Sequence, residues 1–230
     1  MKQEQLERTI GLIGEKATKK LEESTILLCG LGGVGGTALE ALVRTGIGHF
    51  IIVDFDKVAS SNLNRQILYT QKDIGRSKVE AAKERILSIN NEAFIDAIEE
   101  KVDISLIKKL NNYHIDFIID AIDDVLAKVE LAKYASENHI PYISSLGMAN
   151  RFNATDVIVT RLDKTTGDPL AKKLRYEFKK AGIDTKNIIV SFSKEQPIKD
   201  GVKLNSIMMP PSSSGLAIAS YVIQELIKGD

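Results

Sequence analysis

The apolar residues of this chain alternate between short continuous runs and stretches with helical spacing. The continuous runs, which predict strands, lie at 25–29, 49–54, 94–99, 116–120 and 140–144. The helically spaced stretches between them lie at 35–46, 76–90, 103–111 and 124–138, after a polar helical lead-in at 4–22. Strands that alternate with helices in this way predict an α/β fold with a Rossmann-like, mostly parallel sheet and helices on both faces.

The pattern changes after Gly147. Residues 155–160 and 187–192 predict two more strands, 169–181 and 213–228 predict helices, and a polar loop covers 193–205. Asp168 before a proline is typical of a helix N-cap, and Gly182 of a helix stop. Pro210 and Pro211 are expected to shape the turn before the last helix. We expect this part to extend the same sheet with antiparallel strands.

Composition narrows the functional classes. The 230 residues include 31 Lys and Arg and 31 Asp and Glu, so the net charge is zero. A globally basic nucleic-acid binder is therefore disfavoured, although a local basic patch is not. Residues 1–7 lack the apolar core of a signal peptide, and the apolar run at 215–223 is too short to cross a bilayer. A soluble cytoplasmic protein is the expectation.

Cys29 is the only cysteine of the chain. A disulfide within the chain and a Cys-rich zinc site are therefore impossible. We expect Cys29 to be a small buried filler of the first strand.

A glycine-rich loop joins the first strand to the next helix. Gly30, Gly32 and Gly35 match the G-x-G-x-x-G pattern, with Gly33 between them, and Asp54 ends the following strand. Glycines let the backbone approach a phosphate, and the helix N-terminus directs N–H groups at it. Asp54 lies about where an acid accepts hydrogen bonds from ribose hydroxyls. The loop predicts a nucleotide site, and by itself it would also suit an NAD-dependent dehydrogenase.

Two cations follow in the sequence and favour a triphosphate over a dinucleotide. Arg65 lies in the segment 61–66 and Lys78 in the segment 75–80. Both are expected to reach the nucleotide phosphates, where they would stabilise the charge on a leaving pyrophosphate. Ser77, with Glu80 three residues later, predicts a capping box at the start of the helix.

Three acids follow the fourth predicted strand, where ligands of parallel sheets gather. Asp120 has a structural alternative, and Asp124 has the alternative of a helix N-cap. We therefore assign magnesium to Asp123, because this ion prefers a few carboxylates together with phosphate oxygens.

The chain resembles the superfamily of ubiquitin-activating and sulfur-carrier-activating adenylyltransferases, as a single adenylation domain over 1–230. The similarity rests on the glycine loop and on four later motifs, at 54–56, 61–66, 75–80 and 120–123. A further segment, 8–14, resembles the N-terminal motif of that superfamily. Residues 24–146 would be the nucleotide-binding core and residues 147–230 an extension of the same domain.

This resemblance implies roles for individual residues. The glycines and Asp54 would seat ATP, Asn62 would polarise the α-phosphate region with Asp56 nearby, and Asp123 would hold Mg²⁺. Arg65 and Lys78 would bind the phosphates. Arg8 would reach the ATP site of the neighbouring subunit in a homodimer.

Within the superfamily, the segments 12–17, 44–48, 164–171 and 191–197 make the chain most similar to the dehydratases of threonylcarbamoyladenosine in tRNA. This implies adenylation of the threonyl carboxylate and ring closure with loss of water. Activation of the C-terminus of a ubiquitin-like sulfur-carrier protein is the alternative, with such a carrier or a sulfur-relay protein as partner. The missing Cys-x-x-Cys pairs and thioester cysteine disfavour it. An NAD-dependent oxidoreductase and a scaffold without turnover are further alternatives.

The helix at 169–181 is the candidate surface for tRNA. It carries Lys172, Lys173, Arg175, Lys179 and Lys180. Basic side chains on one helix suit contacts to phosphates, and a solvated amphipathic face is the alternative.

Overall fold

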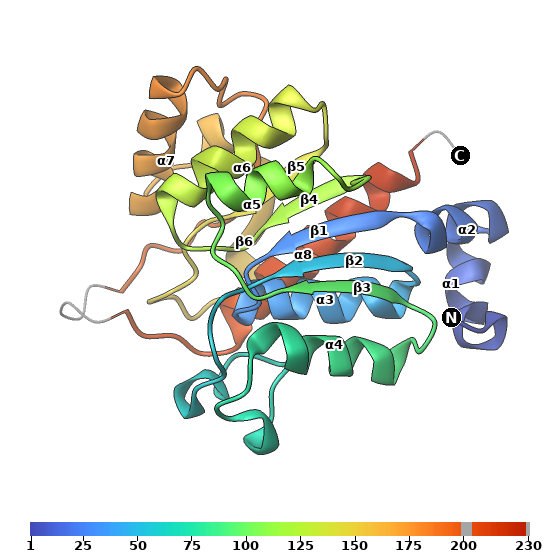
Figure 1. Ribbon diagram of the computed structural model, residues 1–230. Coiled ribbons are helices and arrows are strands. Elements are labelled where there is room, and N and C mark those ends of the chain that lie inside the picture. Colours follow the sequence, from blue (N-terminus) through green and yellow to red (C-terminus); the bar gives the residue numbers. More distant parts are fainter. Residues whose placement is uncertain (199–203, 229–230) are drawn as a thin grey trace.

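The computed structural model describes residues 1–198 and 204–228, and a seven-stranded sheet runs through these residues (Figure 1). The strand order is β3-β2-β1-β4-β5-β7-β6. The strands are β1 (Thr25–Cys29), β2 (His49–Val53), β3 (Phe94–Ile98), β4 (Phe117–Asp120), β5 (Tyr142–Ser145), β6 (Val157–Arg161) and β7 (Ile189–Ser193). The predicted Rossmann-like fold is confirmed.

The sheet is parallel except at one edge. β1 pairs in parallel with both β2 and β4, and β5 pairs in parallel with β4 and β7. Only β6 runs antiparallel, against β7. The expected antiparallel extension therefore consists of the β6–β7 pair, and β7 itself continues the parallel sheet.

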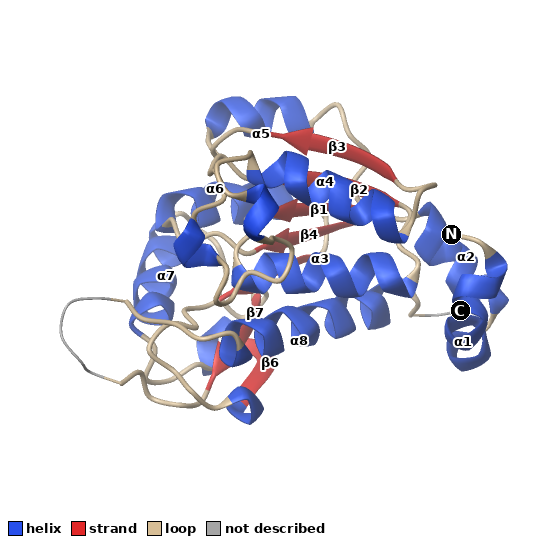
Figure 2. Cartoon of the chain, turned by 90° about the horizontal axis from the view of Figure 1, so that it is seen from below, coloured by secondary structure: helices blue, strands red, loops and turns tan. Residues whose placement is uncertain are grey.

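Helices cover both faces of the sheet (Figure 2). The helices are α1 (Gln3–Ile13), α2 (Glu15–Glu23), α3 (Gly33–Thr45), α4 (Lys78–Ile89), α5 (Ile104–Leu110), α6 (Val125–Glu137), α7 (Pro169–Lys180) and α8 (Met209–Leu226). Short 3₁₀ helices lie at Ser60–Asn62, Gln71–Asp73, Ala154–Asp156 and Leu162–Lys164. Helices α3, α4 and α8 pack on one face, and α5, α6 and α7 pack on the other.

The central strands are apolar throughout because both of their faces are buried. Leu28 belongs to the hydrophobic core under α3 and α8, whereas its neighbour Leu27 belongs to the core under α5 and α6. Both side chains are fully buried. Cys29 is buried with Leu27, as expected, and burial raises the pKa of its thiol.

Most predicted elements differ from the observed ones by one or two residues at their ends, and three differences change the picture. The lead-in is two helices, because Gly14 adopts φ = +87° and breaks it between α1 and α2. Helix α3 begins at Gly33, inside the glycine loop. Helix α8 begins at Met209, so Pro210 and Pro211 lie in its first turn, where the missing N–H groups cost nothing.

The predicted caps have different outcomes. The Asp168 carboxylate accepts a hydrogen bond from the Ala171 N–H, which confirms it as the N-cap of α7. Gly182 follows the end of α7 with φ = +78°, as expected of a helix stop. Ser77 is the N-cap of α4 by position, but its buried hydroxyl makes no hydrogen bond in the described residues, so the predicted capping box is wrong.

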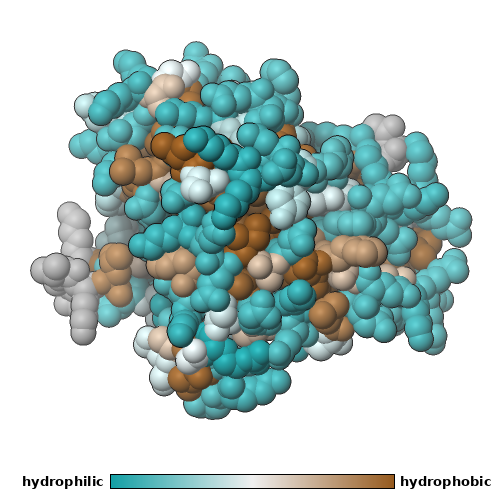
Figure 3. All heavy atoms as spheres, in the orientation of Figure 1, coloured by the Kyte–Doolittle hydropathy of each residue, from teal (hydrophilic) through white to brown (hydrophobic). Residues whose placement is uncertain are grey.

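Hydrophilic side chains cover most of the face in Figure 3, and hydrophobic side chains form separate areas between them. No helix among residues 1–198 and 204–228 combines the length and the apolar character that a membrane crossing requires.

Candidate functional site

Two neighbouring clefts lie at the carboxyl ends of the central strands. The chain moves outward from β1 through β2 to β3 and then returns to place β4 on the other side of β1. Ligands of open α/β sheets bind where the strand order reverses in this way. The first cleft, of about 610 Å³, contains the glycine loop, and the second, of about 930 Å³, opens beside it.

The glycine loop forms the floor of the first cleft. Gly30, Gly32 and Gly33 line it, whereas Gly35 does not. Gly35 is needed for packing, because a Cβ there would lie 1.8 Å from the carbonyl oxygen of Gly30. Gly30 itself has φ = +93°, and its Cβ would lie 2.6 Å from the carbonyl oxygen of Ala121. The loop therefore packs directly against the turn that follows β4.

Asp54 holds the glycine loop from the end of β2. Its carboxylate accepts hydrogen bonds from the N–H of Leu31 at 2.7 Å and from the N–H of Asp56 at 2.9 Å. The Leu31 carbonyl in turn accepts a hydrogen bond from the Tyr69 hydroxyl. The side chain of Asp54 is only 8% exposed, yet it lines the first cleft. Asp54, which the sequence predicts to bind the ribose, thus also fixes the backbone of the glycine loop.

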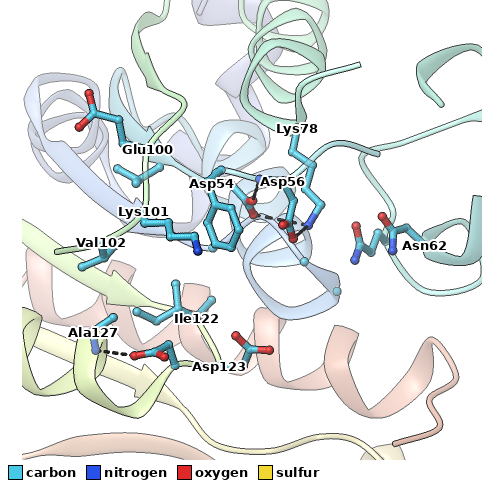
Figure 4. A pocket seen from close by; sticks show the side chains of 18 of the residues that line it. Asp54, Asp56, Asn62, Lys78, Glu100, Lys101, Val102, Ile122, Asp123 and Ala127 are labelled. Atoms are coloured by element: carbon cyan, nitrogen blue, oxygen red, sulfur yellow. Dashed lines mark hydrogen bonds and ion pairs between the residues drawn. The ribbon is translucent and has the colours of Figure 1, made fainter. Parts of the chain in front are cut away.

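Lys78 lies next to two carboxylates on one wall of the first cleft (Figure 4). Its Nζ is 2.8 Å from an oxygen of Asp56 and 3.7 Å from an oxygen of Asp54. The Lys78 side chain is buried, whereas that of Asp56 is half-exposed. Lys78, which the sequence predicts to bind phosphates, therefore lies in the cleft, and Asp54 and Asp56 hold its ammonium at the wall.

Arg65 and Asn62 come from the segment between β2 and α4. The guanidinium of Arg65 donates hydrogen bonds to the Ser61 carbonyl and to the Asn64 side chain, both at 2.8 Å. Asn62 accepts a hydrogen bond from the N–H of Ala59. Both predicted residues line the first cleft, and hydrogen bonds within residues 59–65 hold their side chains in place.

Asp120 at the end of β4 and the two acids that follow it, Asp123 and Asp124, have separate positions. Asp120 is fully buried, and the Asp124 carboxylate caps α6 by accepting a hydrogen bond from the Ala127 N–H at 2.8 Å. Asp123 is exposed and lies on the wall opposite Lys78 and Asp56, beside Ile122 (Figure 4). Among the described residues Asp123 has no hydrogen bond and no ion pair, so its carboxylate is available to a ligand.

The second cleft shares a wall with the first. Residues that line both clefts include Arg65, Asp123 and the turn at Ala121 and Ile122. The remainder of the second cleft is built by small and apolar side chains together with several polar ones. They include Ser145, Leu146, Gly147, Met148, Pro169, Leu170, Asn64 and Ser206. A ligand in the second cleft can therefore meet a nucleotide in the first at Arg65 and Asp123.

Arg8 is the one predicted site residue that lies far from both clefts. It is exposed on α1, and the neighbouring Leu6 packs against Gly46 at the C-terminal end of α3. The clefts lie at the other end of α3, which has 13 residues and so is about 20 Å long. Arg8 therefore cannot reach the clefts of its own chain.

Three residues of the clefts were not foreseen from the sequence. Gln66 lines the first cleft with only 6% of its surface exposed, and its Oε1 has no hydrogen-bond partner among the described residues. The Lys101 ammonium lies 4.7 Å from the centre of the Phe55 ring at the same cleft. Gln66 directly follows Arg65, so the motif contained a signal, whereas Lys101 and Phe55 meet only through the fold.

No group of three or more His, Cys, Asp and Glu residues that could hold a metal occurs in the described part of the chain. A metal in the clefts would therefore need ligand atoms from a bound substrate in addition to protein carboxylates.

Sequence comparison identifies the family of the chain, since the ThiF family matches residues 5–228. The chain belongs to the ThiF family. The resemblance to adenylyltransferases is thereby confirmed over almost the whole sequence.

Several named proteins of this family are similar to the chain in sequence or in structure. The tRNA threonylcarbamoyladenosine dehydratase of Bacillus subtilis is 35% identical, over 94% of this chain and 92% of that protein. The crystal structure of the Escherichia coli tRNA N6-threonylcarbamoyladenosine dehydratase in complex with ATP has 32% identity and a TM-score of 0.93. That match covers 98% of this chain and 94% of the other. The molybdopterin-synthase adenylyltransferase of E. coli is 32% identical over 65% of this chain and 57% of that protein.

Proposed function

We propose that this protein uses ATP to adenylate a carboxylate and thereby cyclises threonylcarbamoyladenosine in tRNA with loss of water, in the cytoplasm. The observation that carries the proposal is the shared wall of the two clefts, where Arg65 and Asp123 face both. A nucleotide over the glycine loop would place its phosphates at this wall, next to an acyl substrate in the second cleft. The named relatives, which are dehydratases of this substrate, support it.

The first cleft provides the groups that a triphosphate needs. Backbone N–H groups of the glycine loop and the N-terminus of α3 suit phosphate oxygens. Arg65 and Lys78 supply two positive charges, and positive charge at a leaving pyrophosphate lowers the barrier of phosphoryl-type substitution. Lys78 is held by Asp54 and Asp56 at the wall, so it is preorganised and loses little freedom when a ligand binds.

Asp123 fits a magnesium ion because its carboxylate is exposed to both clefts and has no partner in the described residues. Magnesium typically takes one or two carboxylates and completes its shell with water and phosphate oxygens. When bound, the ion would neutralise charge on the phosphates. The absence of a larger acidic cluster in the described residues agrees with a metal that arrives with its nucleotide.

The proposed reaction has two steps. The threonyl carboxylate attacks the α-phosphorus, and pyrophosphate leaves, which gives an acyl-adenylate. An internal nucleophile of the same modified side chain then attacks the acyl carbon, AMP leaves, and a ring closes with net loss of one water. AMP is a much better leaving group than oxide, so the site needs mainly to hold both substrates in contact and to stabilise charge.

The proposal also takes residues 1–230 as one adenylation domain. Arg8 adds a further part, in which the protein is a homodimer. Arg8 is exposed and lies at the opposite end of α3 from its own clefts. In a dimer with two-fold symmetry, the same surface on each chain would bring Arg8 to the phosphates of the partner.

The alternative is activation of the C-terminus of a ubiquitin-like sulfur-carrier protein. The partial similarity to a molybdopterin-synthase adenylyltransferase favours it. The single cysteine opposes it, because Cys29 is buried in β1 and cannot form the thioester or the Cys-rich zinc site of such enzymes.

Pyrophosphate release tests the proposal directly. We expect ATP-dependent release with tRNA that carries threonylcarbamoyladenosine, and loss of one water from that nucleoside by mass spectrometry. Unmodified tRNA and a sulfur-carrier protein are the comparison substrates, and Asp123→Asn is the inactive control. Release with the carrier protein alone would establish the alternative. No release with either substrate, together with an NADH fluorescence change on binding, would rule out adenylation.

A further inference from the structure

The exposed side of α7 carries four lysines around one tyrosine. This surface, the α7 basic face, consists of Lys172, Lys173, Tyr176, Lys179 and Lys180, all of which are exposed. Tyr176 is 67% exposed, so most of its surface is open to solvent. The only acid of the helix is Glu177, which is half-buried.

The four lysines have no carboxylate partners among the described residues. On other helices basic side chains commonly form ion pairs, as Lys109 does with Glu100 at 2.6 Å and Lys133 with Glu130 at 3.2 Å. No ion pair or hydrogen bond involves Lys172, Lys173, Lys179 or Lys180 in the part of the chain that the structure describes. The chain has zero net charge, so the α7 basic face is a local concentration of positive charge.

Arg175 does not belong to this face, contrary to the sequence prediction. Its guanidinium turns inward and donates hydrogen bonds to the Leu162 carbonyl at 3.3 Å and the Thr165 carbonyl at 3.1 Å. It also contacts the Thr165 hydroxyl. Arg175 therefore ties α7 to the preceding 3₁₀ helix and is not available to an external ligand.

The helix is fixed firmly on the sheet. Ala171, Leu174 and Phe178 form its inner side, and all three are fully buried. At its start, the Arg151 guanidinium lies 2.8 Å from the capping carboxylate of Asp168, and both side chains are buried. Because the inner side is fixed, the backbone that carries the lysines and Tyr176 is already ordered, and this part of the entropy cost of binding is avoided.

The α7 basic face starts at the second cleft. Asp168, Pro169 and Leu170 line that cleft, and Lys172 and Lys173 follow in the first two turns of the helix. The 12 residues of α7 extend about 18 Å. In Figure 3 the surface over α7 is mainly hydrophilic. A ligand chain that leaves the second cleft along α7 therefore meets positive charge continuously.

We propose that the α7 basic face binds the RNA strand next to the nucleoside that reacts in the second cleft. The lysines contact its phosphates, and a base that is not paired stacks on Tyr176. Specific RNA recognition targets unpaired loops whose bases stack on aromatic side chains, and phosphate contacts supply most of the affinity. The inference rests on the proposed function, because an acyl substrate on a protein would not present this combination of phosphates and bases.

Binding of a tRNA that carries threonylcarbamoyladenosine tests the inference by fluorescence anisotropy at several salt concentrations. We expect Lys173→Gln/Lys180→Gln to weaken binding at least about tenfold and to reduce the slope of log K against log salt by about one to two. Tyr176→Ala should weaken binding roughly tenfold, and Tyr176→Phe should restore it, since only the ring is needed for stacking. The matched control is Lys72→Gln/Lys83→Gln, on the opposite side of the sheet.

Two outcomes separate this inference from the proposed function. If the wild type cyclises the nucleoside but the α7 variants bind RNA as the wild type does, with the same salt slope, the α7 basic face is not the RNA site. If the wild type neither binds the RNA nor releases pyrophosphate with it, the proposed substrate itself is wrong. Equal weakening by the control pair would show a general charge effect and would also overturn the inference.

Discussion

Lys128 and Asp120 form an ion pair of 3.0 Å in which both side chains are fully buried. The Lys128 ammonium also donates hydrogen bonds to the Ser144 hydroxyl at 2.8 Å and the Ser145 carbonyl at 3.0 Å. The other oxygen of Asp120 accepts hydrogen bonds from the hydroxyls of Tyr142 and Ser144. This network joins the ends of β4 and β5 directly behind the turn that carries Asp123. It therefore ties the end of β4 to Ser145, which lines the second cleft.

We expect Lys128→Met to destabilise the protein by about 3–5 kcal/mol, because it leaves the Asp120 carboxylate buried without a partner. The double variant Lys128→Met/Asp120→Asn should recover much of this loss, and Tyr142→Phe alone should cost only about 1 kcal/mol. Urea unfolding of the wild type, Lys128→Met, Asp120→Asn and the double variant measures the coupling. Additive effects in the double variant would show that the two charges do not depend on each other.

Removal of either cation of the first cleft should slow adenylation. We expect Arg65→Ala and Lys78→Ala each to lower the rate of pyrophosphate release at least about tenfold, since a charge partner of the transition state is lost. Lys83→Ala, on the same helix as Lys78 but away from the cleft, is the control and should be unchanged. Normal release in both cleft variants would show that the phosphate assignment is wrong.

The glycines of the loop should differ from glycines elsewhere in their tolerance of a methyl group. Gly35→Ala places a Cβ 1.8 Å from the Gly30 carbonyl oxygen, so we expect loss of stability and of ATP binding. Gly11→Ala meets no atom within 4 Å and lies inside α1, so it should stabilise the protein by about 0.5–1 kcal/mol. Thermal unfolding with and without ATP distinguishes the two. A Gly35→Ala protein that unfolds and binds ATP as the wild type does would contradict the packing argument.

Glu40 on α3 should make stability depend on pH. Burial alone would raise the pKa of Glu40, but hydrogen bonds from Arg85 and Arg44 outweigh it and hold the pKa below its ordinary value. An acid with a lowered pKa in the folded state stabilises the protein above its unfolded pKa, and this contribution is lost as the pH falls through the folded pKa. Glu40→Gln should therefore cost about 1–2 kcal/mol at pH 7.

Unfolding by denaturant at pH 7 and in the acidic range tests the Glu40 prediction. The difference in unfolding free energy between wild type and Glu40→Gln should shrink as the pH falls below the ordinary glutamate range. A difference that stays constant with pH would mean that the ionised carboxylate is not the cause.

Subunit mixing tests the proposed sharing of the site. A mixture of Arg8→Ala and Asp123→Ala chains should regain roughly a quarter of the wild-type activity, because half the dimers are mixed and each has one intact site. A mixture of Lys78→Ala with Asp123→Ala is the control and should regain none, since both residues serve the same cleft. Absence of recovery in proven mixed dimers would place Arg8 outside the site.

The sequence by itself determined the order of strands and helices, the glycine loop and the motifs around Arg65, Lys78 and Asp123. It could do so because a parallel strand buried on both faces needs a continuous apolar run, and a phosphate loop needs glycines at fixed spacing. For Asp120, Asp123 and Asp124 the sequence left several roles open, since an acid at a strand end can bind a metal, cap a helix or form a buried pair.

Only the tertiary structure decided which partner each polar group has. Lys128 lies in a helix that is ordinary in sequence, and its pairing with Asp120 depends on how α6 packs across β4 and β5. In the same way, Arg175 turns inward to Thr165, while the lysines beside it pair with no carboxylate among residues 1–198 and 204–228. Such contacts join residues from separate elements, and their energies depend on burial and distance, which periodicity and spacing along the chain do not contain.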